Sequence, residues 1–291
     1  GQVAIVEPNG NRRALQNVVW SNDVITGDVP NNATTGQLVV TRSDSGLSTI
    51  NSVTVHVGNG GFPVMTVAAG TTIQAAIEAA QPGALVLVPP GNYREPVVIT
   101  KPLQLQGWGA GSTVIDGLKV PPASVQGWHE LVNRLVNCNP TQIDLLPGQG
   151  NNQLLPGGGS PSTCGRALHS GLFATEEGAT ILVAPKSNSF SNNVPSRIDG
   201  FTATGTNQGG GIVVNGFARF LEISNNLVTN NLGFAGGGIR LGHSGLLSPQ
   251  NPTLYVSAQN SNVKIHHNHV SENGSVGGVG VLQTLSAPGG G

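Results

Sequence analysis

Three similar stretches in the last third of the chain decide its fold: Arg197-Ile198-Asp199-Gly200-Phe201, Glu222-Ile223-Ser224-Asn225-Asn226 and Lys264-Ile265-His266-His267-Asn268. A polar turn, a glycine-rich step and another apolar run follow each of them. The first two copies lie 25 residues apart, and the next two lie 42 apart. Removing a 17-residue loop over 244–260 restores the interval of 25. The region therefore repeats with one period.

A unit of this size, with β-branched strands and no helical periodicity, cannot bury its apolar face alone and must stack on its neighbours. Stacking at about 4.8 Å turns equivalent positions into ladders of touching side chains. The expected ladders are Ile198, Ile223 and Ile265 facing inward, Ala203, Val228 and Val270 after the turn, Arg197, Glu222 and Lys264 facing outward with alternating charge, and Asn226 and Asn268 at the turn. The sequence predicts an all-β chain built mainly as a parallel β-helix, a solenoid.

Composition narrows the classes of partner. The 291 residues include 43 Gly and 19 Pro, only 9% are charged, and the net charge is −1. This composition excludes a protein that binds nucleic acid or a membrane surface through a cluster of basic residues. No run of 18 apolar residues exists, so no membrane span is expected. The 37% of hydrophobic residues in short β-branched runs favours a packed chain over a disordered one.

Residues 1–58 alternate apolar and polar letters over 3–6, 18–20, 36–41 and 52–57, which predicts a small β-sandwich followed by a linker over 59–63. The letters Trp20-Ser21-Asn22-Asp23-Val24-Ile25, Gly36-Gln37-Leu38-Val39-Val40 and Val53-Thr54-Val55 resemble the later part of an IPT/TIG immunoglobulin-like domain. The resemblance implies that the first third of that domain lies upstream of Gly1.

The β-helix is expected over 64–291, opening with an amphipathic helix at 71–80 that has a Thr cap and apolar residues at Ile73, Ala76, Ile77 and Ala80. This opening, with the run through Val88-Pro89-Pro90-Gly91-Asn92-Tyr93 and Val114-Ile115-Asp116-Gly117, resembles pectin-lyase-like right-handed β-helices, where the helix caps the interior. A long loop insertion is expected over 118–180. The chain stops at Pro288-Gly289-Gly290-Gly291 with no closing cap, so a longer polypeptide is expected at both ends.

The two resemblances together are typical of large secreted or surface proteins of bacteria, which places the chain outside the cell. Cys138 and Cys164 support that location if they form a disulfide, and two free thiols are the alternative. The open strand edge of the last coil is expected to suit another copy of the chain, and polysaccharide is the other expected partner.

Catalytic candidates come from the resemblance, because enzymes of this superfamily act on acidic polysaccharides through carboxylate pairs or through basic residues and calcium. Asp199 and His266 are the candidates, in one outward column with Ser224 between them, about 9–10 Å apart. A solvated turn residue is the alternative interpretation of Asp199. Trp108 and Trp128 are candidates for a sugar-stacking platform, with buried packing within the insertion as the alternative.

His243, His266 and His267 form the densest group of possible metal ligands, suited to Zn or Cu. A strand would place His266 and His267 on opposite faces, which limits a shared site, and surface histidines without a chemical role are the alternative. The leading hypothesis is a non-catalytic extracellular structural or binding module that needs no cofactor. A polysaccharide lyase, hydrolase or epimerase is the second hypothesis, and metal binding is the third.

Overall fold

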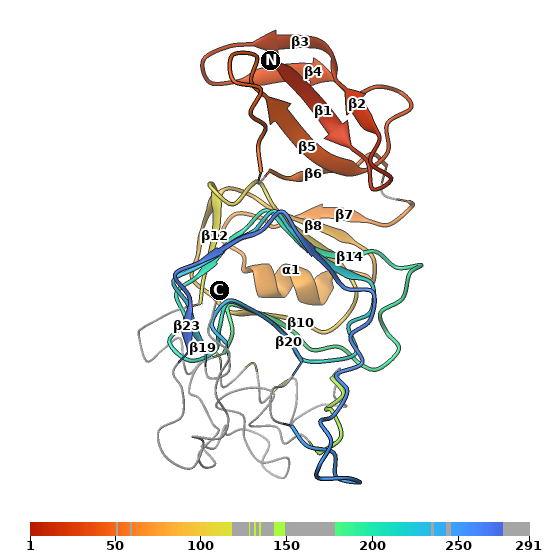
Figure 1. The fold of residues 1–291 in the computed structure, drawn as a ribbon, viewed down its shortest axis with the longest axis vertical. Helices are drawn as coiled ribbons and strands as arrows, with labels where there is room; N and C mark the ends of the chain where they lie inside the picture. The colour runs from red at the N-terminus through yellow and green to blue at the C-terminus, as the bar shows by residue number, and fades with distance from the viewer. Residues whose placement is uncertain are drawn as a thin grey trace.

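The structure is a computed structural model that describes residues 1–50, 52–58, 60–117, 128, 131, 134, 143–148, 178–233, 236–242 and 246–275. Strands dominate this part of the chain, and helix α1 is short (Figure 1). An all-β chain was expected, and the β-rich content confirms it.

The N-terminal strands form a four-stranded antiparallel sheet in the order β2-β1-β5-β6, and a separate hairpin pairs β3 with β4. Their bounds are β1 Gln2–Val6, β2 Arg12–Ala14, β3 Gln16–Trp20, β4 Ile25–Asp28, β5 Gly36–Thr41 and β6 Thr54–Val55. The alternation of apolar and polar residues predicted β1, β3, β5 and β6 but not β2 and β4. Strand β2 lies at the edge of its sheet and β4 is exposed along its whole length, so neither carries a pattern of buried residues.

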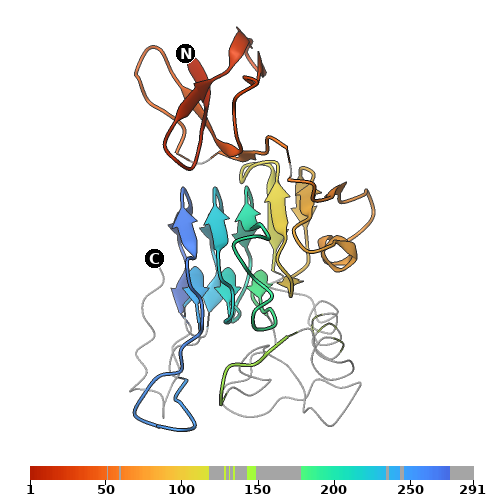
Figure 2. The same cartoon turned by 90° about the vertical axis from the view of Figure 1, so that its right-hand side faces the viewer.

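The rest of the described chain forms three larger parallel sheets, and the chain adds a strand to each of them in turn. Their orders are β7-β8-β11-β14-β17-β21, β9-β12-β15-β18-β22 and β10-β13-β16-β20. Their bounds are β7 Val64–Thr66, β8 Leu85–Val88, β9 Gly91–Tyr93, β10 Val97–Ile99, β11 Gln104–Gly107, β12 Thr113–Asp116, β13 Ile181–Val183, β14 Ser196–Asp199, β15 Thr202–Thr204, β16 Ile212–Val214, β17 Leu221–Ser224, β18 Leu227–Thr229, β20 Ile239–Leu241, β21 Lys264–His266 and β22 His269–Ser271. A short parallel pair joins β19 Leu232–Gly233 to β23 Gly274–Ser275. Successive passes of the chain thus lie beside one another (Figure 2).

The predicted side-chain ladders are confirmed by the strand register. Ile198 pairs with Ile223 and Ile223 with Ile265, while Ala203, Val228 and Val270 align in the second sheet. Ile198 and Ile223 are fully buried, but Ile265 is 45% exposed. The difference arises because β21 is the last strand of its sheet in the described part of the chain.

The core lies between the three parallel sheets, and helix α1 (Ile73–Ala79) covers one end of it. Thr72 is the N-cap, and Ile73, Ala76 and Ile77 are buried, as predicted. Figure 1 shows α1 across the space that the sheets surround. Glu95 accepts hydrogen bonds from the first helical amides, and the Gln74 side chain bonds both backbone groups of Val98 on β10. The helix therefore meets both the apolar interior and a strand edge.

Two asparagine ladders join the passes at their turns. The side chain of Asn226 bonds the Phe201 amide and the Ile198 carbonyl of the preceding pass, and Asn268 does the same one pass later. This ladder was predicted. A second ladder, Asn231 and Asn273, repeats the pattern and was missed. Each ladder satisfies turn backbone groups that would otherwise be buried without a partner.

Truncating the isoleucine ladder at two heights tests the stacking. We expect Ile223→Ala to lower the free energy of unfolding by about 3–4 kcal/mol, because it removes a fully buried side chain and leaves a cavity. Ile265→Ala should cost less than half of that, because the side chain is already 45% exposed. Chemical denaturation of both variants measures the difference, and equal losses would contradict the burial gradient along the ladder.

Candidate functional site

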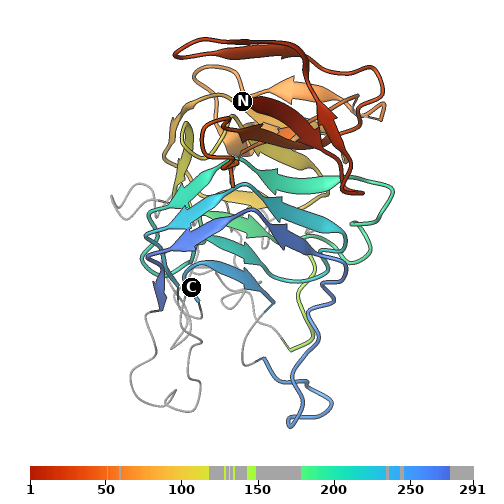
Figure 3. The same ribbon diagram turned by 45° about the horizontal axis from the view of Figure 1, so that its top comes forward.

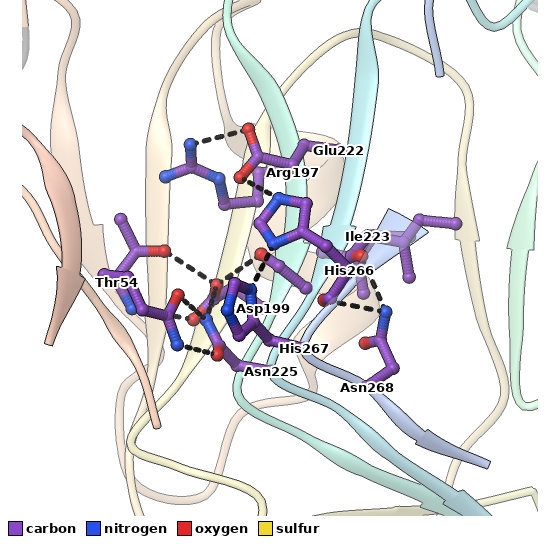
Figure 4. A network of polar contacts seen from close by, with 12 residues as sticks. Thr54, Arg197, Asp199, Glu222, Ile223, Asn225, His266, His267 and Asn268 are labelled. Atoms are coloured by element: carbon purple, nitrogen blue, oxygen red, sulfur yellow. Dashed lines mark hydrogen bonds and ion pairs between the residues drawn. The ribbon is translucent and has the colours of Figure 1, made fainter. Parts of the chain in front are cut away.

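Figure 3 shows the strands of the first parallel sheet side by side, and the outer face of this sheet carries the main polar cluster of the described chain (Figure 4). Alternation along each strand points the ladder isoleucines inward, so their neighbours point outward. One outward column holds Arg197, Glu222 and Lys264, and the next holds Asp199, Ser224 and His266. We use the name outer polar network for the residues of these two columns together with Asn225 and His267. The network also includes their hydrogen-bond partners in the N-terminal segment, Gln37, Ser52 and Thr54.

Asp199 is the most enclosed member of this network. Its side chain is fully buried, and its Oδ1 accepts a hydrogen bond from the Thr54 amide at 3.1 Å. Its Oδ2 accepts three more, from Thr54 Oγ1, Ser224 Oγ and Asn225 Nδ2, at 2.8, 2.7 and 2.7 Å. The interpretation of Asp199 as a solvated turn residue is wrong, because β6 of the N-terminal sheet lies over it. No oxygen of this carboxylate faces solvent or a substrate.

The N-terminal segment contacts the parallel sheet through further polar groups. Gln37 and Asn225 pair through their side-chain amides in both directions, and the Ser52 amide donates to Asn225. On β11, Gln106 Nε2 donates to the Thr54 carbonyl at 2.9 Å. These contacts span β11, β14 and β17, so one face of the sheet receives the whole segment.

His56 takes part in the same contact. Since the amide nitrogen of Gln106 is directed at Thr54, its carbonyl oxygen faces His56 Nε2, which must therefore carry the proton. Burial lowers the pKa of His56, and the nearby positive charge of Arg197 acts in the same direction, while the hydrogen bond to Gln106 and the charges of Asp199 and Glu222 oppose it. The neutral imidazole is the form that fits this contact.

A second line of contacts in the network runs from Arg197 to His267. Arg197 Nη2 donates to Glu222 Oε2 at 2.8 Å, and Glu222 Oε1 lies 3.0 Å from His266 Nε2. The Nδ1 atoms of His266 and His267 are 2.7 Å apart, with the rings nearly perpendicular (Figure 4). Burial alone would raise the pKa of Glu222, but the hydrogen bond from His266 and the charge of Arg197 outweigh it and lower that pKa to about 2.

The histidine pair corrects one expectation. A strand was expected to separate His266 from His267, but β21 ends at His266, and His267 has a φ of 54°. This left-handed turn brings the second ring back to the first.

The register confirms the predicted charge column, because Glu222 lies between Arg197 and Lys264. In the described chain, however, Glu222 uses its oxygens on Arg197 and His266, and Lys264 makes no ion pair.

Trp128 is the one remaining candidate that the structure places apart from the network. Trp128 is only 2% exposed and packs with Val98, Leu182 and Val213 on the outer face of the third parallel sheet. A sugar platform of Trp108 and Trp128 is therefore wrong: although Trp108 is exposed, Trp128 has no open face. His243, Cys138 and Cys164 lie outside the described residues, as does most of the 118–180 insertion, so the disulfide stays a prediction.

Several residues of this contact were not predicted from the sequence. Gln37 bonds Asn225 and Thr54 bonds Asp199 from positions more than a hundred residues away, and Gln106, on the neighbouring strand β11, bonds the Thr54 carbonyl. No local motif marks them. In the described residues no group of three or more His, Cys, Asp or Glu side chains is arranged to hold a metal ion, and no described helix has the length and apolarity that crossing a membrane requires.

Comparison with protein-family models, with curated proteins and with solved structures finds no match for this chain. We therefore infer the function of the outer polar network from the geometry of its residues.

The ion pairs of Glu222 predict an acid-sensitive contribution to stability. Its pKa is 4.5 when unfolded and about 2 in the fold, so the stabilisation is complete above pH 4.5 and is lost as the pH falls toward 2. The total is at most about 3 kcal/mol. We expect Glu222→Gln to lose this pH-dependent part of the free energy of unfolding, measured by urea denaturation from pH 5 to pH 2. Glu272→Gln, at an exposed carboxylate, should keep the pH-dependent part. If the free energy of unfolding depends on pH equally in both variants, Glu222 is not the source of the acid sensitivity.

His56 predicts a second, milder sensitivity at higher pH. Because its pKa in the fold lies below the usual 6.5, the folded state binds fewer protons than the unfolded chain, and stability decreases as the pH falls below about 6.5. We expect the melting temperature to decrease between pH 7.5 and pH 5.5, and His56→Gln to reduce that decrease. His269→Ala, at an exposed histidine on β22, serves as the control. A decrease unchanged in His56→Gln would count against the buried neutral form.

Proposed function

We propose that this chain is a non-catalytic structural or binding module of a larger secreted or cell-surface protein. In this proposal the three parallel sheets form a right-handed β-helix, and the N-terminal strands are part of an immunoglobulin-like domain fixed to its side. The support is the strand order: whatever the length of the loops, the passes that begin at β8, β11, β14 and β17 each add one strand to each of the three sheets in the same order. Right-handed connection is the strong default for parallel strands joined by a crossover.

One observation carries the functional part of the proposal: the polar cluster that could have served chemistry is used to join two parts of the chain. Asp199 receives four hydrogen bonds, two of them from Thr54. A buried carboxylate is tolerated only with such partners. Losing the N-terminal contact would leave it with unsatisfied acceptor sites, so the contact resists bending. A rigid joint of this kind suits a spacer or a presenting surface.

The polysaccharide-enzyme hypothesis has weaker support, because its candidate carboxylate is enclosed. Glycosidic hydrolysis needs two carboxyl groups that reach the substrate, and Asp199 does not reach solvent. The extracellular location rests on the family resemblances and on the predicted disulfide. Polysaccharide and further copies of the chain stay the proposed partners, together with the rest of a longer polypeptide.

Amide hydrogen exchange at Thr54 tests the joint directly, because this amide donates to Asp199. We expect Asp199→Asn to speed exchange of the Thr54 amide by about 10- to 100-fold, since the variant replaces an acceptor oxygen with a donor and loses the charge, a change of about 1–3 kcal/mol. Asp44→Asn, at an exposed acid in the same segment, should leave the rate unchanged.

Two results would contradict the proposal. One is a Thr54 amide that exchanges equally fast in the wild type and in Asp199→Asn. The other is the release of unsaturated or shortened sugars from pectate or alginate by the wild-type chain, with loss of that activity in Asp199→Asn.

A further inference from the structure

The histidine pair at the end of β21 has a feature that the structural role does not use. His266 donates its Nε2 proton to Glu222, because the carboxylate is an acceptor only, so the lone pair of a neutral His266 lies on Nδ1. Arg197 holds Glu222 from the other side through a 2.8 Å ion pair. The carboxylate thus fixes both the tautomer and the orientation of the ring. The same outer support, a carboxylate on the far nitrogen, is typical of histidines that bind metals.

The second ring completes a chelating geometry. His267 directs its own Nδ1 at that of His266, 2.7 Å away. Two lone pairs cannot face each other at this distance, so one shared proton lies between the rings in the metal-free state. A metal ion that binds both nitrogens would displace this proton, and the exposed side of His267 gives it access.

We propose that His266 and His267 bind one divalent transition-metal ion through their Nδ1 atoms, with Cu²⁺ preferred and Glu222 as the outer support. The spacing favours this metal. With metal–nitrogen distances of about 2.0 Å, two neighbouring ligands of a square-planar centre lie about 2.8 Å apart, and those of a tetrahedral centre about 3.3 Å apart. The observed 2.7 Å is near the square-planar value. The order of metal affinities for nitrogen sites also places Cu²⁺ above Ni²⁺ and Zn²⁺.

The remaining coordination positions belong to water, since among the described residues no third His, Cys, Asp or Glu side chain completes the site. The hydrogen bond between the two imidazole Nδ1 atoms is also separate from the hydrogen bonds that Thr54, Gln37 and Asp199 make in the joint. The proposal therefore holds or fails independently of the proposed structural role.

The variants can be matched to the fold, because the preceding pass carries Ser224 and Asn225 at the same two positions. His266→Ser and His267→Asn copy those residues, and Asn tolerates the left-handed backbone of position 267. We expect the purified full chain, dialysed against chelator and then titrated with Cu²⁺ alone, to bind one equivalent with nitrogen couplings in its electron paramagnetic resonance spectrum. Each variant should weaken this binding at least 10-fold, and Glu222→Gln should weaken it 10- to 100-fold.

His269→Ala is the matched control, because it removes an exposed histidine two positions beyond the pair and should leave Cu²⁺ affinity unchanged. Thermal unfolding without metal verifies that each variant is folded. The proposal is overturned if Cu²⁺ binds equally well to the double variant His266→Ser with His267→Asn, if the bound ion shows no nitrogen coupling, or if Zn²⁺ binds more tightly than Cu²⁺.

Discussion

Backbone pairing between successive passes of the chain is the constraint on which the rest of the structure depends. In a parallel ladder the register places each side chain between the equivalent side chains of the preceding and following strands. Each residue must therefore pack against both of these neighbours. The interior columns satisfy this with Ile198, Ile223 and Ala203, and the turns satisfy it with asparagines whose amides bond the preceding pass. Errors in register would expose the apolar set.

The same constraint concentrates the few charges of the chain. Outward columns on the first sheet bring Arg197, Asp199 and Glu222 close together although the chain as a whole is poor in charge. Burial of a carboxylate is unfavourable unless donors surround it. For Asp199 two of those hydrogen bonds come from Thr54. The carboxylate therefore obtains all of its hydrogen bonds only when the N-terminal strands dock on the sheet. A polar contact of this type fixes orientation more sharply than an apolar one, because hydrogen bonds are directional.

The turn after each strand of the first sheet decides what the next position presents. Gly200, Asn225 and His267 occupy it on successive passes, all with positive φ. The left-handed backbone turns the side chain back toward the strand that precedes it. On one pass this places Asn225 against Asp199 and Gln37, and on the following pass it places His267 against His266. One backbone geometry thus supports both a contact with the N-terminal strands and a histidine pair.

The sequence alone determined the features that depend on local pattern and period. The 25-residue interval predicted which isoleucines align, and the Thr72 cap with Ile73, Ala76 and Ile77 predicted α1, because periodicity and capping are readable within one segment. The environment of Asp199, the burial of Trp128 and the meeting of His266 with His267 were decided by tertiary structure alone. Thr54, which donates two hydrogen bonds to Asp199, lies 145 residues away in the chain, and Trp128 is covered by the outer face of the third parallel sheet. The two histidines meet because His267 has a positive φ, and the residue types at these positions do not predict that backbone angle. Physical contact between distant segments has no signature in either segment taken singly, and for that reason only the folded chain could show it.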